Sequence, residues 1–442
     1  MNKPFIVVQG PVATRSGYGN HTRDLVTALI KADKYDIKII SLPWGHTPKN
    51  ALELGNKDHD EIQKRIITQN ITQQPDVFIQ ISVPNEFQKV GKYNIGITAG
   101  IETTIVSPEF IQGSNKMDLL ITTSEHSKQG FLNAVFEKMN EKTKQKIGDL
   151  KLEIPVEVLF EGADLNVYKK TSEIHKTVTD ALKNIPNDFC YLFVGHWLSG
   201  NLGQDRKDIG MMIKTVCESF KRKSKKNRPG LVLKTSSATF SIKDRDSIIS
   251  KIQRLVEPYG DSAVDIYLLH GDLTDEEMNS LYNHPKMKSM VSFTKGEGFG
   301  RPLLEYSITG KPVIASNWSG HIDFLNKDYC TLLPGKLTQV DPSASDKFIL
   351  KEAKWFTVDY QYASQVIQDV TTNYKTYLSK SRKQTQYVKD NFSLEKMSEE
   401  FCKMVDKGLT NVPHEVSLNL PKLKKIKNVP KLKLPKLKKV EL

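Results

Sequence analysis

The chain has 442 residues, of which 38% are hydrophobic, and this suffices for two domains that each bury a core. No run approaches the roughly 18 consecutive apolar residues of a membrane span, and the apolar run near the N-terminus is too short for a signal-peptide core. We therefore expect a cytoplasmic protein. The four cysteines are scattered without a Cys-x-x-Cys pair, which argues against a zinc site or a disulfide framework.

Much of the positive charge lies at the C-terminal end. The net charge is +13, but residues 421–442 hold nine lysines and one glutamate, a net +8, which leaves +5 for the other 420 residues. Prolines recur in this segment and oppose a continuous helix, so we expect 411–442 to be flexible until bound. Lysine attracts phosphate as a point charge. The segment therefore suits DNA as a partner, ahead of an anionic membrane surface or another protein, although a lysine-favouring codon bias explains the composition equally well.

The first half alternates apolar runs with helical patterns, which predicts a parallel, doubly wound sheet. Strands are predicted at 5–8, 35–40, 77–81, 94–98 and 119–122. A helix is predicted over 22–31, and another over the highly charged stretch 134–153. Between the first strand and helix, Gly17 and Gly19 place backbone N–H groups where α/β folds bind ligands, although an ordinary tight turn explains them as well.

The second half repeats this pattern, with strands predicted at 191–195, 231–233 and 266–269 and helices at 360–380 and 393–407. Arg206 and Lys207 lie in the loop after the first of these strands, as a candidate cation pair or as ordinary surface residues. Asp244 and Asp246 form an Asp-x-Asp pattern, which can bind metal. They stand at a predicted helix start, so we expect capping carboxylates there and no metal site.

The stretch from residue 290 to 316 has the features of a ligand site. An apolar strand is followed by a loop with Gly296, Gly298 and Gly300, then by a helix and a further strand. Free N–H groups at a helix N-terminus suit a phosphate or a hydroxyl-rich ligand. Two glutamates, Glu297 in the loop and Glu305 in the helix, stand eight residues apart. For an arbitrary pair of glutamates, solvated surface charges would be the ordinary interpretation.

The pattern from Glu297 to Glu305, Glu-Gly-Phe-Gly-x-Pro-x-x-Glu, resembles the donor-sugar signature of retaining GT-B glycosyltransferases, especially glycosyltransferase family 4. Gly310-Lys-Pro-Val-Ile-Ala-Ser316 follows it, as in that family. The resemblance covers nearly all of the first 410 residues. It implies two Rossmann-like, doubly wound domains facing a cleft. The expected organisation is an acceptor-side domain at 1–170, a nucleotide-sugar domain at 171–385, a returning helix at 386–410 and the flexible tail at 411–442.

The resemblance also implies roles for individual residues of the second domain. Glu297 would hold the donor sugar, and Glu305 the ribose hydroxyls. Arg206 and Lys207 would neutralise the departing diphosphate, in place of the family's usual Gly-Arg and Lys-Gly positions. The remaining donor contacts implied here are the backbone groups of Gly298, Phe299 and Gly300, and the nucleobase loop at Gly271 and Leu273.

On the acceptor side, the resemblance implies that the loop with Gly17 and Gly19 faces the donor phosphates and the acceptor. Family members often place a histidine after the strand that corresponds to 94–98. This sequence lacks it, and either Glu102 or His126 takes its place. The stretch from Val156 to Asp164 resembles the family's interdomain hinge, with Glu161 in place of asparagine.

The implied reaction is retaining transfer of a hexosyl or pentosyl group from a nucleotide-diphosphate sugar to a hydroxyl, with no metal or other cofactor. We consider three interpretations of the function, of which the first two differ in the acceptor. The first is modified DNA, such as hydroxymethylated bases, as used by some phage glycosyltransferases acting in the host cytoplasm. The second is an envelope glycan or lipid, the commoner role in family 4. The third is a carbohydrate- or nucleotide-binding structural protein with decayed catalysis, against which Glu297, Glu305 and the glycines argue.

Overall fold

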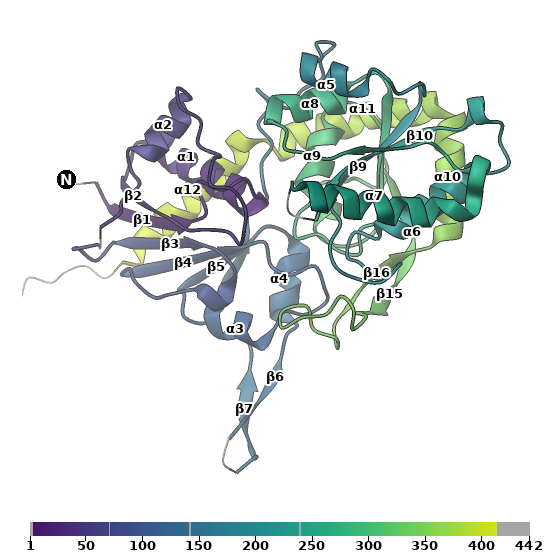
Figure 1. Ribbon diagram of the computed structural model, residues 1–442. Helices are drawn as coiled ribbons and strands as arrows, with labels where there is room; N and C mark the ends of the chain where they lie inside the picture. The colour runs from purple at the N-terminus through teal and green to yellow at the C-terminus, as the bar shows by residue number, and fades with distance from the viewer. Residues whose placement is uncertain (1–2, 70, 141–142, 238–239, 413–442) are drawn as a thin grey trace, which may run out of the picture. The chain divides into compact units, whose positions relative to one another are not determined.

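Two parallel, six-stranded sheets organise the chain in the computed structural model (Figure 1), which describes residues 3–69, 71–140, 143–237 and 240–412. The first sheet has the strand order β2-β1-β3-β4-β5-β8 and the second β11-β10-β9-β12-β13-β14. The first consists of β1 (Phe5–Gly10), β2 (Asp36–Ser41), β3 (Val77–Ile81), β4 (Tyr93–Thr98), β5 (Leu119–Thr122) and β8 (Val156–Val158). The second consists of β9 (Cys190–His196), β10 (Gly230–Ser236), β11 (Ile266–Leu269), β12 (Met287–Ser292), β13 (Val313–Ser316) and β14 (Thr331–Leu333).

Helices form most of the connections between the strands, as is usual for parallel sheets. With the first sheet go α1 (Gly17–Ala32), α2 (Lys57–Gln63), α3 (Pro108–Ser114) and α4 (Glu125–Leu132). With the second go α5 (Lys176–Leu182), α6 (Ile209–Phe220), α7 (Ile242–Val256), α8 (Asp275–Asn283), α9 (Arg301–Ser307), α10 (Tyr360–Thr372) and α11 (Tyr374–Asn391). A two-stranded pair, β15 (Gly335–Gln339) and β16 (Lys354–Val358), and a last helix, α12 (Leu394–Thr410), complete the described fold.

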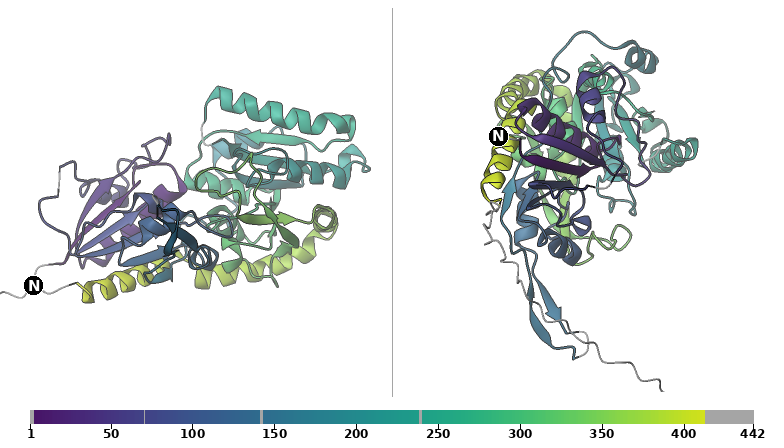
Figure 2. Two further views of the ribbon diagram at one scale, coloured as in Figure 1. Left: turned by 90° about the horizontal axis from the view of Figure 1, so that it is seen from below. Right: turned by 90° about the vertical axis from the view of Figure 1, so that its left-hand side faces the viewer.

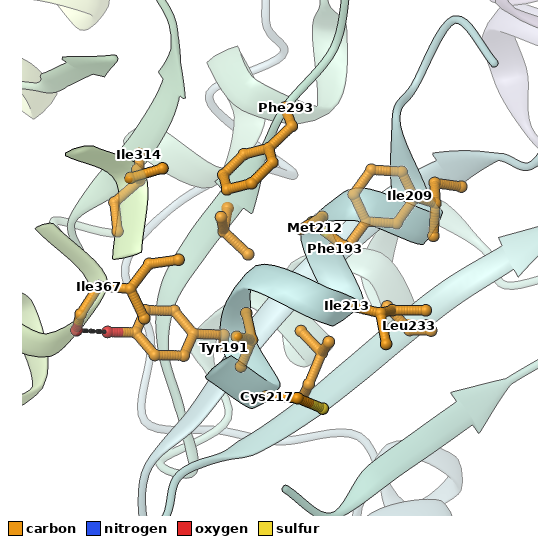
Figure 3. Close-up of a cluster of buried hydrophobic side chains, with 14 of the residues drawn as sticks. Tyr191, Phe193, Ile209, Met212, Ile213, Cys217, Leu233, Phe293, Ile314 and Ile367 are labelled. Atoms are coloured by element: carbon orange, nitrogen blue, oxygen red, sulfur yellow. Dashed lines mark hydrogen bonds between the residues drawn. The ribbon is translucent and has the colours of Figure 1, made fainter. Parts of the chain in front are cut away.

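Both faces of the second sheet are buried, and this explains its continuous apolar strands. Along β9, Tyr191 and Phe193 enter one core cluster, while Cys190 and Leu192 enter a cluster on the opposite face. Figure 3 shows the first of these clusters, where the Tyr191 hydroxyl donates a hydrogen bond to the Ile367 carbonyl (2.6 Å). The predicted α/β class with two doubly wound sheets is therefore confirmed.

The last helix, α12, packs against the first sheet although it follows the second in the sequence. Figure 2 shows this helix beside the first sheet. Its buried residues Met397, Phe401 and Val405 lie in the same core cluster as the strands β1 to β5 and the apolar face of α1. By their contacts, residues 1–412 form one compact unit. The predicted domain boundary near residue 170 stays a prediction.

The helix predicted over 134–153 is wrong. The chain instead forms an antiparallel hairpin of β6 (Phe136–Met139) and β7 (Lys146–Leu150), which projects from the body in Figure 1. The prediction assigned the charged residues to the solvated face of a helix, but they are the solvated side chains of an exposed β-hairpin. Within the described strands β6 and β7, Leu150 is the one buried residue, and Phe136, its partner across the hairpin, is partly buried. A helix here would have no apolar face to bury.

Smaller differences have local causes. The first helix begins at Gly17 rather than near residue 22, because the Ser16 side chain caps it by accepting a hydrogen bond from the Gly19 N–H (3.0 Å). The helix predicted over 360–380 is divided at Asn373 into α10 and α11. No helix in the described part is long and apolar enough to cross a membrane. From Pro413 onward, the predicted flexible tail lies outside the described residues.

Candidate active site

The loop between β12 and α9 carries Glu297, and its geometry depends on glycine. Gly300 has a φ of 102°, a left-handed conformation that disfavours other residues, and it caps the start of α9. A Cβ added at Gly296 would lie 2.0 Å from the carbonyl oxygen of Glu102, so only glycine permits this approach. The loop is thereby held directly against the segment that follows β4.

Glu297 is buried, with 7% of its surface exposed, and it is bound on three sides. Its backbone N–H donates to the Ser319 hydroxyl (2.9 Å), and its carboxylate forms ion pairs with the Lys207 ammonium and, at 3.5 Å, with the Arg206 guanidinium. Burial alone would raise the pKa of Glu297, but Lys207 and Arg206 lower this pKa to about 2. The carboxylate is therefore ionised at neutral pH.

The two cations occupy the end of the loop between β9 and α6. Besides Glu297, Arg206 contacts the Glu102 carboxylate at 2.8 Å and the Gly296 carbonyl at 3.2 Å. Burial lowers the pKa of Lys207 even though Glu297 raises it. The two cations, whose side chains are 15% and 11% exposed, are thus balanced by two carboxylates, one from each sheet's loops. The structure brings together the predicted residues Glu297, Arg206, Lys207 and Glu102.

Glu305 lies in a separate polar cluster on α9. Its carboxylate accepts hydrogen bonds from the Arg301 guanidinium (3.2 Å) and the Tyr282 hydroxyl (3.3 Å). Arg301 also forms an ion pair with Asp24 of α1 at 2.7 Å. Burial raises the pKa of Glu305 to about 7, although Arg301 opposes the shift. Glu305 therefore titrates near neutral pH, in contrast to Glu297.

His126 lies outside the cluster formed by Glu297, Arg206, Lys207 and Glu102. Its ring packs edge-on against Trp318 with 4.5 Å between ring centroids, and burial lowers its pKa to about 4. Within the described residues, its Nε2 atom has no hydrogen-bond partner. Of the two residues proposed in place of the family's histidine, Glu102 is the one that forms an ion pair with Arg206.

The predicted glycines near the N-terminus, Gly17 and Gly19, lie in the first turn of α1 rather than in the preceding loop. Between them, Tyr18 was missed by the sequence analysis. Its hydroxyl lies 2.9 Å from the Thr98 hydroxyl and accepts a hydrogen bond from the Ala99 N–H (3.0 Å), at the start of the segment that leads to Glu102. No sequence signal distinguished Tyr18 from other tyrosines.

The predicted nucleobase loop follows β11. The carbonyl of Gly271 accepts a hydrogen bond from the Lys234 ammonium (2.6 Å), and Leu273 is partly buried. The structure therefore adds Lys234, whose position at the end of an apolar strand was a usable signal. It also adds Arg301, whose glutamate partner four residues later in a helix is a recognisable pair.

Asp244 and Asp246 serve the fold. Asp244 accepts hydrogen bonds from the Ser237 N–H (3.1 Å) and pairs with the His270 ring at 2.8 Å, while Asp246 contacts its neighbour Arg245. In the part of the chain that the structure describes, no group of three or more His, Cys, Asp and Glu residues is placed to hold a metal ion. The expectation of a metal-independent reaction stays a prediction.

No protein-family model and no curated protein match this sequence. Solved structures do match its fold. A glycosyltransferase from Rickettsia africae is 14% identical over 93% of this chain and 100% of its own, with a TM-score of 0.61. Sucrose-phosphate synthase from Thermosynechococcus elongatus is 14% identical over 92% of this chain and 99% of its own, also with a TM-score of 0.61. The chain has the GT-B fold.

A third match extends this observation. HepE from Anabaena, in complex with UDP-glucose, is 11% identical over 91% of this chain and 99% of its own, with a TM-score of 0.57. At these identities the likeness establishes the architecture alone, and this architecture is the one that the family resemblance implied.

Proposed function

We propose that this protein is a retaining glycosyltransferase that moves a sugar from a nucleotide-diphosphate sugar to an acceptor hydroxyl. The observation that carries the proposal is the buried carboxylate of Glu297, held by Lys207 and Arg206 beside the loop at Gly298–Gly300. Carboxylates bind sugar hydroxyls, and two cations beside the carboxylate suit the phosphates of the same donor. The GT-B fold supports this interpretation.

In the proposed reaction, Arg206 and Lys207 stabilise the negative charge that develops on the diphosphate as it leaves. Such electrostatic stabilisation by groups already in place is often the largest contribution to catalysis. The donor phosphates would compete with Glu102 for Arg206, because that ion pair occupies the guanidinium in the free protein. Glu297 and the loop amides would hold the sugar while the acceptor hydroxyl attacks from the face that the diphosphate leaves.

Glu305 would bind the ribose hydroxyls of the donor, as the family resemblance implies. Its burial and its hydrogen bonds to Arg301 and Tyr282 fix the carboxylate at one place on α9. The solved complex of HepE with UDP-glucose, on the same fold, supports a nucleotide sugar as the donor class. For the acceptor, we propose hydroxymethylated DNA, on the strength of the lysine-rich tail at 411–442.

The test is release of nucleoside diphosphate from a panel of nucleotide sugars, with and without hydroxymethylcytosine DNA. The proposal predicts release from one donor, stimulated by the DNA, with the sugar recovered on the DNA. Release that DNA does not stimulate would support glycosyltransferase activity but would point to a glycan or lipid as the acceptor. The Lys207→Met variant is the matched negative control. If no donor is bound in calorimetry, the transfer proposal is wrong and a decayed site is the better description.

A further inference from the structure

The turn that presents the cation pair has a second, buried side. Residues 205–208 read Asp-Arg-Lys-Asp, and the two central side chains contact Glu297. The flanking carboxylates of Asp205 and Asp208 are 2% and 0% exposed. Asp205 accepts a hydrogen bond from the Ile209 N–H (3.4 Å) at the start of α6. The turn thus joins an outward-facing cation pair to inward-facing acids.

Asp208 has an unusual backbone and environment for a charged residue. Its φ of 51° is left-handed, and its carboxylate accepts a hydrogen bond from the Tyr360 hydroxyl (2.5 Å). The same carboxylate oxygen lies 3.4 Å from the ammonium of Lys295, which is itself only 1% exposed. Among the described residues, the second oxygen of Asp208 has no hydrogen-bond partner. Lys295 is the one cation in the described part of the chain that forms an ion pair with Asp208.

Lys295 connects this turn to the loop that carries Glu297, two residues further along. Its backbone N–H donates to the Arg206 carbonyl (2.7 Å), and its carbonyl accepts from the Phe356 N–H (2.9 Å) on β16. Its ammonium donates to the Thr357 hydroxyl (2.8 Å) besides facing Asp208. One residue thus bonds both to the turn with the cations and to the strand behind it.

A buried ion pair of this kind is a poor way to add stability. Desolvation of the two charges offsets their attraction, and apolar residues of similar volume are often equally stable or better. A buried pair does restrict geometry, because neither charge can move away from the other without a large penalty. Charged groups that act on a transition state must be held to within a fraction of an ångström, since a displacement of about 1 Å can cost a hundredfold in rate.

We propose that Lys295 and Asp208 are positioning residues that hold Arg206 and Lys207 in register with Glu297. This inference rests on the proposed function for its kinetic consequence. The buried pair fixes the turn from behind, so that the cations meet the departing diphosphate at a set position. Both residues are buried against each other and would act through Arg206 and Lys207.

The experiment compares Lys295→Met, Asp208→Asn and the double variant. Asparagine tolerates the left-handed backbone at residue 208, and methionine approximates the volume of lysine. Each single variant leaves one buried charge unpaired, so a loss of stability is expected from either. The double variant removes both charges of this pair and should recover the urea midpoint of the wild type. We expect its kcat to stay 10- to 100-fold low with KM changed less than threefold.

Recovery of both stability and kcat in the double variant would overturn the proposal, because the pair would then be structural only. If the single variants do not fold, Tyr360→Phe gives a milder test. It removes the hydroxyl that holds Asp208 and keeps both charges. We expect a smaller fall in kcat, about threefold to tenfold, at unchanged KM. A wild-type kcat in this variant would also count against positioning.

A readout without substrate separates this inference from the proposed function. Carboxyl-carbon NMR, assigned with Glu297→Gln, reports whether Glu297 is ionised at pH 3.5. In the wild type we expect it to be ionised. In the double variant, loosened cations should let it take up a proton at that pH. Unchanged ionisation would refute the inference even if no donor were ever found, while altered ionisation without any turnover would count against the proposed function alone.

Discussion

Replacing Glu297 with glutamine tests the centre of the site, because the change removes one negative charge and almost no volume. The cations Lys207 and Arg206 lower the pKa of Glu297 to about 2 from an ordinary value of 4.5, against the opposing effect of burial. Each pKa unit corresponds to about 1.4 kcal/mol, so the ionised carboxylate contributes about 3 kcal/mol to stability at neutral pH.

The folded-state pKa of Glu297 lies below the unfolded value, so this contribution is complete above about pH 5 and is lost as the pH falls toward 2. We expect E297Q to be less stable than the wild type by about 3 kcal/mol at pH 7, but by only about 1 kcal/mol at pH 3. Urea unfolding at both pH values measures the difference. A stability difference that does not shrink toward acid pH would refute the charge pairing.

Turnover gives the second half of this test. The amide of E297Q cannot balance Lys207 and Arg206, so both the sugar contact and the placement of the cations should suffer. We expect nucleoside diphosphate release to fall by about 100-fold or more. Glu276→Gln, at the exposed start of α8, is the matched control and should turn over normally. Wild-type turnover by E297Q would show that Glu297 has no part in the reaction.

Three further predictions concern neighbouring groups. Lys207→Met should lower kcat by about 100-fold, because one cation facing the leaving diphosphate is lost, whereas Lys243→Met on the exposed side of α7 should not; equal kcat values would exclude the cation role. Because burial raises the pKa of Glu305 to about 7, its carboxylate ionises between pH 6 and 8, and nucleotide-sugar affinity measured by calorimetry should rise about tenfold over that range. The same affinity should be independent of pH in Glu305→Gln, and a flat wild-type profile would contradict the ribose role. Ser319 has a φ of 77° and a ψ of −164°, a region that glycine alone adopts readily. Alanine and glycine substitutions both remove its hydrogen bond from the Glu297 N–H, so Ser319→Gly should be more stable than Ser319→Ala by about 1 kcal/mol in urea unfolding, and the reverse order would argue against strain.

The sequence by itself determined the class of the fold and supplied the candidate residues of the site. Continuous apolar strands alternating with helical patterns are local signals, and so is a glycine loop before a helix. The eight-residue spacing from Glu297 to Glu305 is also local, and it pointed to the GT-B fold that the solved structures then supported. Arg206 and Lys207 were proposed because the family resemblance implies cations in the loop that follows the first strand of the second sheet.

The secondary-structure prediction was wrong for a segment where charge was the main signal and burial was unknown. The hairpin of β6 and β7 was predicted as a helix, because a charged, polar stretch has the composition of both an exposed helix and an exposed ribbon. What distinguishes them is whether an apolar face has something to pack against. Leu150 meets the body only at the base of the hairpin, and that neighbourhood exists only after folding.

The tertiary structure alone decided which charged residues meet. Glu102 and Arg206 are over one hundred positions apart, and Asp24 and Arg301 are separated by 277, yet each pair forms an ion pair at less than 3 Å. Lys295 looked like an ordinary loop lysine and is instead buried against Asp208. Sequence patterns report the periodicity of one segment, whereas the partner of a buried charge depends on how separate segments pack. The sequence therefore indicates which residues are chemically suited to the reaction, and the tertiary structure determines which neighbours hold each of them in place.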